Sequence, residues 1–148
     1  MKSRYYLLVV LFAIFSLPEQ TVAQSTQELL IGTWSFNYDS SISKMEAEMK
    51  VRLETMPQTQ RSSIEKAYKN RKITFYANGN YLISISDGSQ AAGSWILTEN
   101  GNTIKMTSSK GSAFIQNIER LFPTQLVLKP RLNGQEKAFI TEWHYTKN

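Results

Sequence analysis

The sequence predicts an all-β fold with a helical insertion, an eight-stranded antiparallel up-and-down β-barrel. Asx-Gly pairs recur through the second half of the chain, and the segments between them alternate apolar and polar residues with period two. Asn, Asp and Gly tolerate the positive φ of a type I′ turn, so each pair predicts a tight hairpin. The pairs are Asn78-Gly79, Asp87-Gly88, Asn100-Gly101 and Asn133-Gly134. Weaker breaks at Lys110-Gly111 and Phe122-Pro123 complete a series of turns 9 to 13 residues apart.

The first 23 residues have the pattern of a cleaved signal peptide. Lys2 and Arg4 precede an apolar run of 13 residues, 5–17, which is too short to cross a hydrocarbon core of about 30 Å. Small residues ending at Ala23 are typical of a cleavage site. We therefore expect residues 24–148 to form one exported domain, secreted or periplasmic, with no membrane span.

Composition and single residues argue against several function classes. The chain has no cysteine, which excludes a lipid-anchored lipoprotein, disulfides and thiolate metal sites. Its net charge of +5 is scattered rather than gathered in a stripe, so no nucleic-acid partner is predicted. The single histidine, His144, is expected on an outer face, and Asp39 and Asp87 are explained by a helix start and a turn. We predict a non-enzymatic protein with no catalytic, metal or cofactor site.

A helical hairpin of about residues 41–70 is predicted between the first two strands. The first strand, 31–38, alternates apolar and polar residues and carries Trp34, Phe36 and Tyr38 on one face. Ser43 and Glu46 then have the spacing of a capping box. An apolar stripe with helical spacing follows, and Pro57 separates it from a second helix near 59–70. The stripe consists of Met45, Met49, Leu53 and Met56.

Seven further strands follow the hairpin. They are centred on Ile73 to Phe75, Tyr81 to Ile85, Gly93 to Leu97, Ile104 to Met106, Phe114 to Ile118, Leu126 to Leu128 and Phe139 to Tyr145. Eight sequential antiparallel strands form either a barrel or a two-sheet sandwich. We favour the barrel, because the last strand can pair with the first and leave no open edge.

The motif Leu30-Ile31-Gly32-Thr33-Trp34, a Gly-x-Trp at the start of the first strand, resembles the lipocalin superfamily. That resemblance implies that Gly32 and Trp34 form the base of the barrel, with a basic residue late in the chain stacked on the Trp. Arg131 and Lys137 are the candidates for that basic residue.

The order of several later segments is similar to that of small exported lipocalin-like proteins of Bacteroidetes. These segments are Met56-Pro57, Ile73-x-Phe75 before Asn78-Gly79-Asn80-Tyr81, Gly93-x-Trp95, Ile118 with Leu121, and Leu126-x-Leu128. The Thr-Asp-Tyr motif of animal lipocalins is missing. The helical hairpin resembles the lid of intracellular fatty-acid-binding proteins in its topological position.

The proposed interior is rich in aromatic residues, which predicts a small hydrophobic ligand whose orientation Tyr and Trp side chains could set. The inward set is Trp34, Phe36, Tyr38, Phe75, Tyr81, Trp95, Phe114, Phe139, Trp143 and Tyr145. The candidate ligand-binding residues are Tyr38, Met49, Met56, Tyr68, Phe75, Tyr81, Trp95 and Trp143. An alternative stays open, in which the barrel is filled and the protein is a protein–protein interaction or cell-envelope module.

Overall fold

The computed structural model describes residues 19–132, 134 and 137–148. It confirms a closed eight-stranded antiparallel barrel in which each strand pairs with the next and β8 pairs with β1. The apolar run 5–17, on which the expected signal peptide depends, lies outside the described residues. The strands are β1 (Gly32–Phe36), β2 (Lys72–Phe75), β3 (Asn80–Ser84), β4 (Gln90–Thr98), β5 (Thr103–Ser108), β6 (Ala113–Phe122), β7 (Gln125–Pro130) and β8 (Trp143–Lys147).

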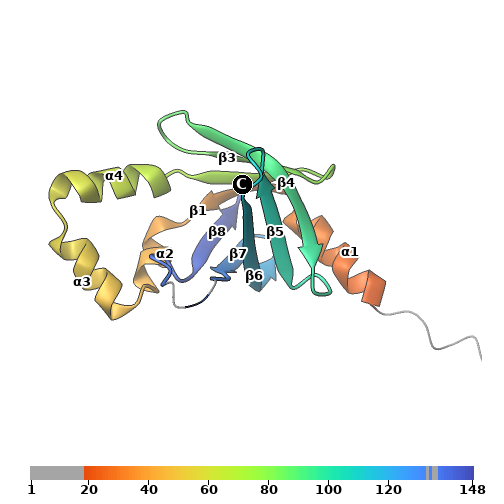
Figure 1. The fold of residues 1–148 in the computed structure, drawn as a ribbon. Coiled ribbons are helices and arrows are strands. Elements are labelled where there is room, and N and C mark those ends of the chain that lie inside the picture. Colours follow the sequence, from red (N-terminus) through yellow and green to blue (C-terminus); the bar gives the residue numbers. More distant parts are fainter. Residues whose placement is uncertain (1–18, 133, 135–136) are drawn as a thin grey trace, which may run out of the picture.

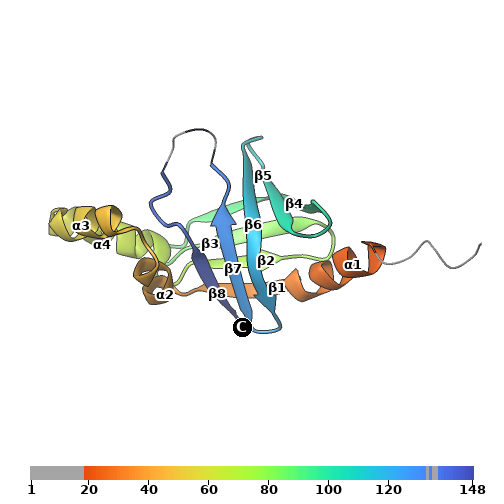
Figure 2. The same ribbon diagram turned by 90° about the horizontal axis from the view of Figure 1, so that it is seen from below.

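Helices lie at both ends of the barrel (Figure 1). They are α1 (Glu19–Leu30), α2 (Tyr38–Ser43), α3 (Ala47–Thr55) and α4 (Gln58–Tyr68). In Figures 1 and 2, α1 lies at the end where β1 begins, and α2 to α4 lie beyond the end where β1 finishes. Because the strands run up and down, the turns after β3, β5 and β7 share the end that carries α2 to α4. We call this end the mouth and the α1 end the base.

The five hairpins between β2 and β7 form where the sequence predicts them, but most of their turns have another geometry. The tight hairpin expected at Asn133-Gly134 was wrong, because a longer connection, residues 131–142, joins β7 to β8, and β8 begins at Trp143 rather than Phe139. Gly79 N–H donates to Tyr76 O at 3.1 Å, and Gly79 alone in its Asx-Gly pair has positive φ, at 81°. This is the three-residue loop that ends in a left-handed glycine. The turns at Gly88 and Gly111 have the same bonding pattern. Between β4 and β5, positive φ extends over Glu99, Asn100 and Gly101. The type I′ expectation was therefore wrong for Asn78-Gly79 and Asp87-Gly88.

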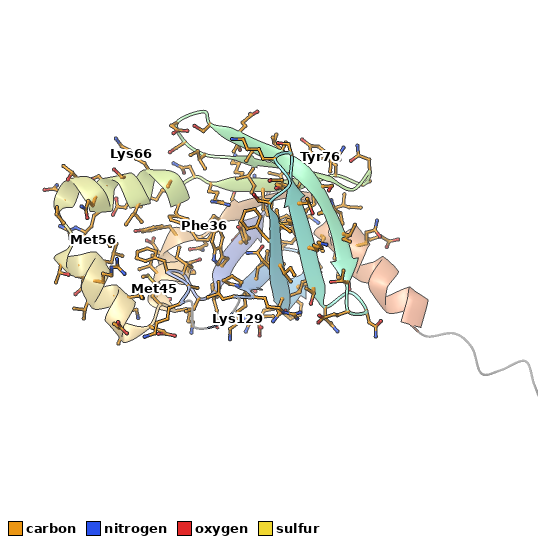
Figure 3. The ribbon with its side chains drawn as sticks, in the orientation of Figure 1. Phe36, Met45, Met56, Lys66, Tyr76 and Lys129 are labelled. Carbon is orange, nitrogen blue, oxygen red and sulfur yellow. The ribbon has the colours of Figure 1, made fainter. Side chains whose placement is uncertain are left out.

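The insertion between β1 and β2 contains three helices rather than the two expected. Asn37 Oδ1 accepts a hydrogen bond from Ser40 N–H at 3.0 Å and caps α2, so Tyr38 begins a helix instead of extending β1. Ser43 ends α2, and its hydroxyl donates to Ser40 O at 2.7 Å instead of forming the predicted capping box. Pro57 separates α3 from α4, as predicted. Figure 3 shows Phe36 between these helices and the strands, with Met56 at the α3–α4 turn.

The base of the barrel is organised around Trp34, whose side chain is fully buried. Its indole N–H donates to Leu30 O at 2.8 Å, at the end of α1. The Lys147 ammonium lies 4.9 Å from the centre of the Trp34 ring and donates to Leu29 O at 2.7 Å. Gly32 has a φ of 127°, and a Cβ there would come within 2.8 Å of Lys147 Cε. Gly32 therefore leaves room for the lysine, which stabilises the last carbonyls of α1.

Neither of the two basic residues proposed from the sequence stacks on Trp34. Arg131 binds Glu99 and Asn117, and Lys137 binds Glu48 at 2.7 Å. The basic residue on Trp34 is Lys147, which the pairing of β1 with β8 places directly opposite it.

Replacing Lys147 by Met removes this cation while keeping most of the apolar stem. We expect the free energy of unfolding to fall by roughly 1–3 kcal/mol, because a cation–π contact and a charge-assisted hydrogen bond are lost. Urea denaturation followed by circular dichroism measures this change. The control is Lys105→Met on the exposed side of β5, where less than about 0.5 kcal/mol is expected. Equal losses in both variants would contradict the role of Lys147.

Candidate functional site

A cavity of about 860 Å³ occupies the mouth half of the barrel. Its inner part is formed by buried side chains from four strands, Ile73, Tyr81, Met106 and Tyr145. Its rim includes Phe114 and Leu132, whose exposed fractions of 56% and 39% show that the cavity opens to solvent. Phe114 faces inward as predicted, since it pairs directly with the buried Met106, and its exposure follows from its place at the rim.

The structure separates the candidate ligand-binding residues into three groups. Tyr81 and Trp143 line the cavity. Phe75 and Trp95 are buried nearer the base, where their rings pack on each other with centres 5.3 Å apart. The remaining candidates belong to the helical insertion and do not line the cavity: Tyr38, Met49, Met56 and Tyr68.

The helices α2 to α4 are attached beside the mouth by polar contacts. Thr141 Oγ1 donates to Lys44 O at 3.0 Å, and Lys137 pairs with Glu48, which joins the β7–β8 loop to the helices. On the other side, Ser86 Oγ donates to Lys66 O at 2.9 Å. None of the residues lining the described cavity comes from α2, α3 or α4. The insertion therefore flanks the cavity and leaves its opening accessible.

Four aromatic residues pack together where α4 meets the barrel. The Phe36 ring lies 5.8 Å from Tyr68, 5.6 Å from Trp143 and 5.4 Å from Tyr145, measured between ring centres. Trp143 also contacts Tyr68 at 5.7 Å, and its indole N–H donates to Ile140 O at 3.2 Å. These contacts hold the Trp143 ring in one orientation at the cavity wall.

Arg71 enters the cavity beside this aromatic cluster. Its backbone is held at the junction of α4 and β2, where its N–H donates to Tyr68 O and its carbonyl accepts from Phe36 N–H. Its guanidinium carbon lies 4.9 Å from the centre of the Trp143 ring and 6.0 Å from that of Tyr68. Its Nε is buried and has no hydrogen-bond partner. The site thus contains a cation supported by aromatic rings.

Two tyrosines in the same wall are held as neutral phenols. Burial raises the pKa of Tyr145 to about 12, and the positive charge of Arg71 and its hydrogen bond with the phenol only partly oppose this shift. Burial also raises the pKa of Tyr81, again against the charge of Arg71. Both phenols keep their protons at neutral pH and can donate hydrogen bonds. The Tyr81 ring is positioned by Gly93, where a Cβ would meet Thr107 O and lie 2.8 Å from Tyr81 Cε1.

Arg131 also borders the cavity, but its charge is already paired. Its guanidinium binds both carboxylate oxygens of Glu99, at 2.6 and 2.9 Å, and donates to Asn117 Oδ1 at 2.8 Å. The hydrogen bond from Arg131 lowers the pKa of Glu99 to about 2. The two arginines of the cavity wall therefore differ, because only Arg131 has a carboxylate partner among the described residues.

Sequence reasoning missed Arg71 because the residue directly follows the helix predicted near 59–70 and belongs to no predicted strand. One signal was present, since none of the residues three or four positions away is acidic. An arginine without such a neighbour has no local ion pair.

In the part of the chain that the structure describes, there is no group of side chains placed to bind a metal ion and no helix that could span a membrane. His144 is half-buried on β8 and contacts Glu142 at 3.1 Å. Within residues 19–132, 134 and 137–148, no three His, Asp or Glu side chains are grouped as metal ligands. Over the same residues, each helix is too short or too polar to cross a bilayer.

Comparisons with known proteins give one similar structure. No protein-family model matches the sequence, and no curated protein matches it. A solved structure of a DUF4847 family protein from Bacteroides vulgatus ATCC 8482 is similar at 17% sequence identity with a TM-score of 0.47. The match covers 83% of this chain and 96% of that protein.

The Glu99–Arg131 pair predicts a dependence of stability on pH. Because the folded-state pKa of Glu99 is depressed from 4.5 to about 2, the pair's stabilisation is present above pH 4.5 and is lost as the pH falls toward 2. Arg131→Gln should weaken this loss, as measured by urea denaturation at pH values across that range. Lys129→Gln, an exposed change on β7, should leave it unaltered. An unchanged pH profile in Arg131→Gln would contradict the assignment.

Proposed function

We propose that this chain is an exported, non-enzymatic, lipocalin-like protein that binds a small hydrophobic ligand in the cavity at the barrel mouth. The cavity itself carries the proposal, because its 860 Å³ lies within the range of about 300–1,000 Å³ usual for small-molecule sites. Its wall is mostly apolar, with a few polar groups that could orient a ligand. The base formed by Gly32, Trp34 and Lys147 supports the lipocalin-like assignment.

The alternative, a protein-interaction module with a filled barrel, has less support. A cavity of this size is not a filled interior. Exposed apolar side chains outside the cavity are distributed over separate elements, with Val51 on α3, Tyr76 after β2, Ile96 on β4 and Phe122 at the end of β6. Single exposed apolar residues are ordinary on protein surfaces and do not by themselves mark an interface.

Export fits the way in which α1 is attached to the barrel. Two hydrogen bonds that join α1 to the base are accepted by Leu29 O and Leu30 O, which lie after the expected cleavage point at Ala23. Cleavage there would keep both contacts.

Expression in a bacterial host with a secretion system is expected to yield a processed protein that begins at Gln24. Intact-mass measurement and amino-terminal sequencing of the secreted or periplasmic fraction would establish the first residue. Ala23→Trp should block processing, because signal peptidase requires a small residue there. Recovery of the uncleaved 16.9 kDa chain from the wild-type gene would contradict the proposed export.

Ligand binding is tested by filling the cavity with a larger side chain. Ala91 on β4 lines the cavity, whereas its neighbour Ala92 does not and points to the opposite face of the strand. We expect Ala91→Trp to weaken binding of a responding ligand at least about tenfold and Ala92→Trp to change it little. Calorimetric titration with fatty acids, retinoids and haem measures this.

The two variants form a matched pair, since each adds one tryptophan to the same strand. If no ligand of the panel binds the wild-type protein, the carrier function is wrong. Equal weakening by both substitutions would place the ligand outside the cavity.

A further inference from the structure

The wall of the cavity carries two positively charged side chains and no negatively charged one. The residues that line it include Arg71 and Arg131 but no aspartate or glutamate. Arg131 is neutralised by Glu99, whereas Arg71 forms no ion pair among the described residues. Placing a cation against low-dielectric walls is costly unless an anion or several hydrogen bonds compensate it. Arg71 shares a hydrogen bond with the Tyr145 phenol but has no anionic partner among the described residues, and a ligand could supply one.

The Arg71 guanidinium is arranged to receive such a partner. The guanidinium carbon lies 4.9 Å from the centre of the Trp143 ring. The backbone of Arg71 is hydrogen-bonded to the backbones of Tyr68 and Phe36. An arginine that contacts an aromatic face can still use the N–H groups at its edge as a fork for an anion. Nε is buried and has no hydrogen bond, so a ligand in the cavity would bind the N–H groups at the end of the guanidinium instead. The ring and backbone contacts hold the guanidinium in place before a ligand arrives, which reduces the entropy lost on binding.

From this geometry we propose that the ligand is a single-chain amphiphile with a carboxylate head group, which binds Arg71 while its apolar tail lies along Ile73, Ile83, Ile85 and Met106. This inference rests on the proposed carrier function and specifies its ligand class. A carboxylate is favoured over a phosphate monoester because one free arginine balances one negative charge, and a dianion would keep excess charge in an apolar wall. The neutral phenols of Tyr81 and Tyr145 provide additional donors close to the same charge.

The test compares three probes of equal chain length with the full-length protein: decanoate, decanol and decyl phosphate. All are kept below the concentrations at which they aggregate, and affinities are measured by calorimetry at pH 7.5. We expect decanoate to bind about tenfold or more tightly than decanol and more tightly than decyl phosphate. Quenching or enhancement of tryptophan fluorescence provides a second readout, because Trp143 contacts the arginine.

Two variants with the same change in charge identify the cation responsible. Arg71→Gln should reduce the affinity for decanoate roughly 10- to 100-fold and change that for decanol less than about threefold. Lys69→Gln is the control, since Lys69 lies two positions away, pairs with the exposed Glu65 and does not line the cavity. It should leave both affinities within about twofold. Arg71→Lys should show an intermediate loss, because the ammonium keeps the charge without the fork.

The outcomes separate this inference from the proposed function. Equal binding of decanoate and decanol would overturn the carboxylate site and leave the carrier function standing, a comparison that needs only the wild-type protein. Preference for decyl phosphate would overturn the choice of carboxylate. Equal effects of Arg71→Gln and Lys69→Gln would overturn the role of Arg71. If none of the probes binds, and the wider ligand panel also fails, the carrier function falls together with the inference.

Discussion

The pairing of β8 with β1 is the constraint on which the rest of the structure depends. It closes the barrel and removes the two open edges that eight sequential strands would otherwise leave. It also sets Lys147 opposite Trp34 and Tyr145 opposite Phe36. The first of these pairs forms the base, and the second forms part of the aromatic cluster at the cavity wall. One register therefore determines both ends of the interior.

Closure at one end and space at the other follow from where large side chains are placed along the strands. Trp34, Phe75 and Trp95 are buried toward the base, where Gly32 allows close approach of Lys147. Toward the mouth the inward positions include Ala91, Ser108 and other small or half-buried side chains, which do not meet across the barrel. The helices α2 to α4 are joined to the barrel beside this opening, and Tyr68 of α4 packs on Phe36 and Trp143 behind the cavity wall. The result is a barrel that is packed at its base and hollow at its mouth.

Three segments that are distant from one another in the sequence surround Arg71. The end of α4 provides Tyr68, β1 provides Phe36 and β8 provides Trp143, and the arginine stands among them without a carboxylate partner. The contrast with Arg131, which borders the same cavity but is paired with Glu99, shows why a count of basic residues says little about a site. The proximity of an opposite charge decides which arginine is available to a ligand.

The sequence by itself determined the succession of eight strands, the positions of the turns between β2 and β7 and the helical insertion, because period-two alternation, left-handed glycines and Pro57 act locally. It also identified Trp34 as a base residue and Tyr81 and Trp143 as residues that prove to line the cavity. Only the tertiary structure decided that Lys147 rather than Arg131 or Lys137 stacks on Trp34, that Tyr38 begins a helix, and that Met49 and Met56 lie away from the cavity. These outcomes depend on contacts between residues far apart in the chain, and strand register and helix placement create those contacts only when the barrel closes.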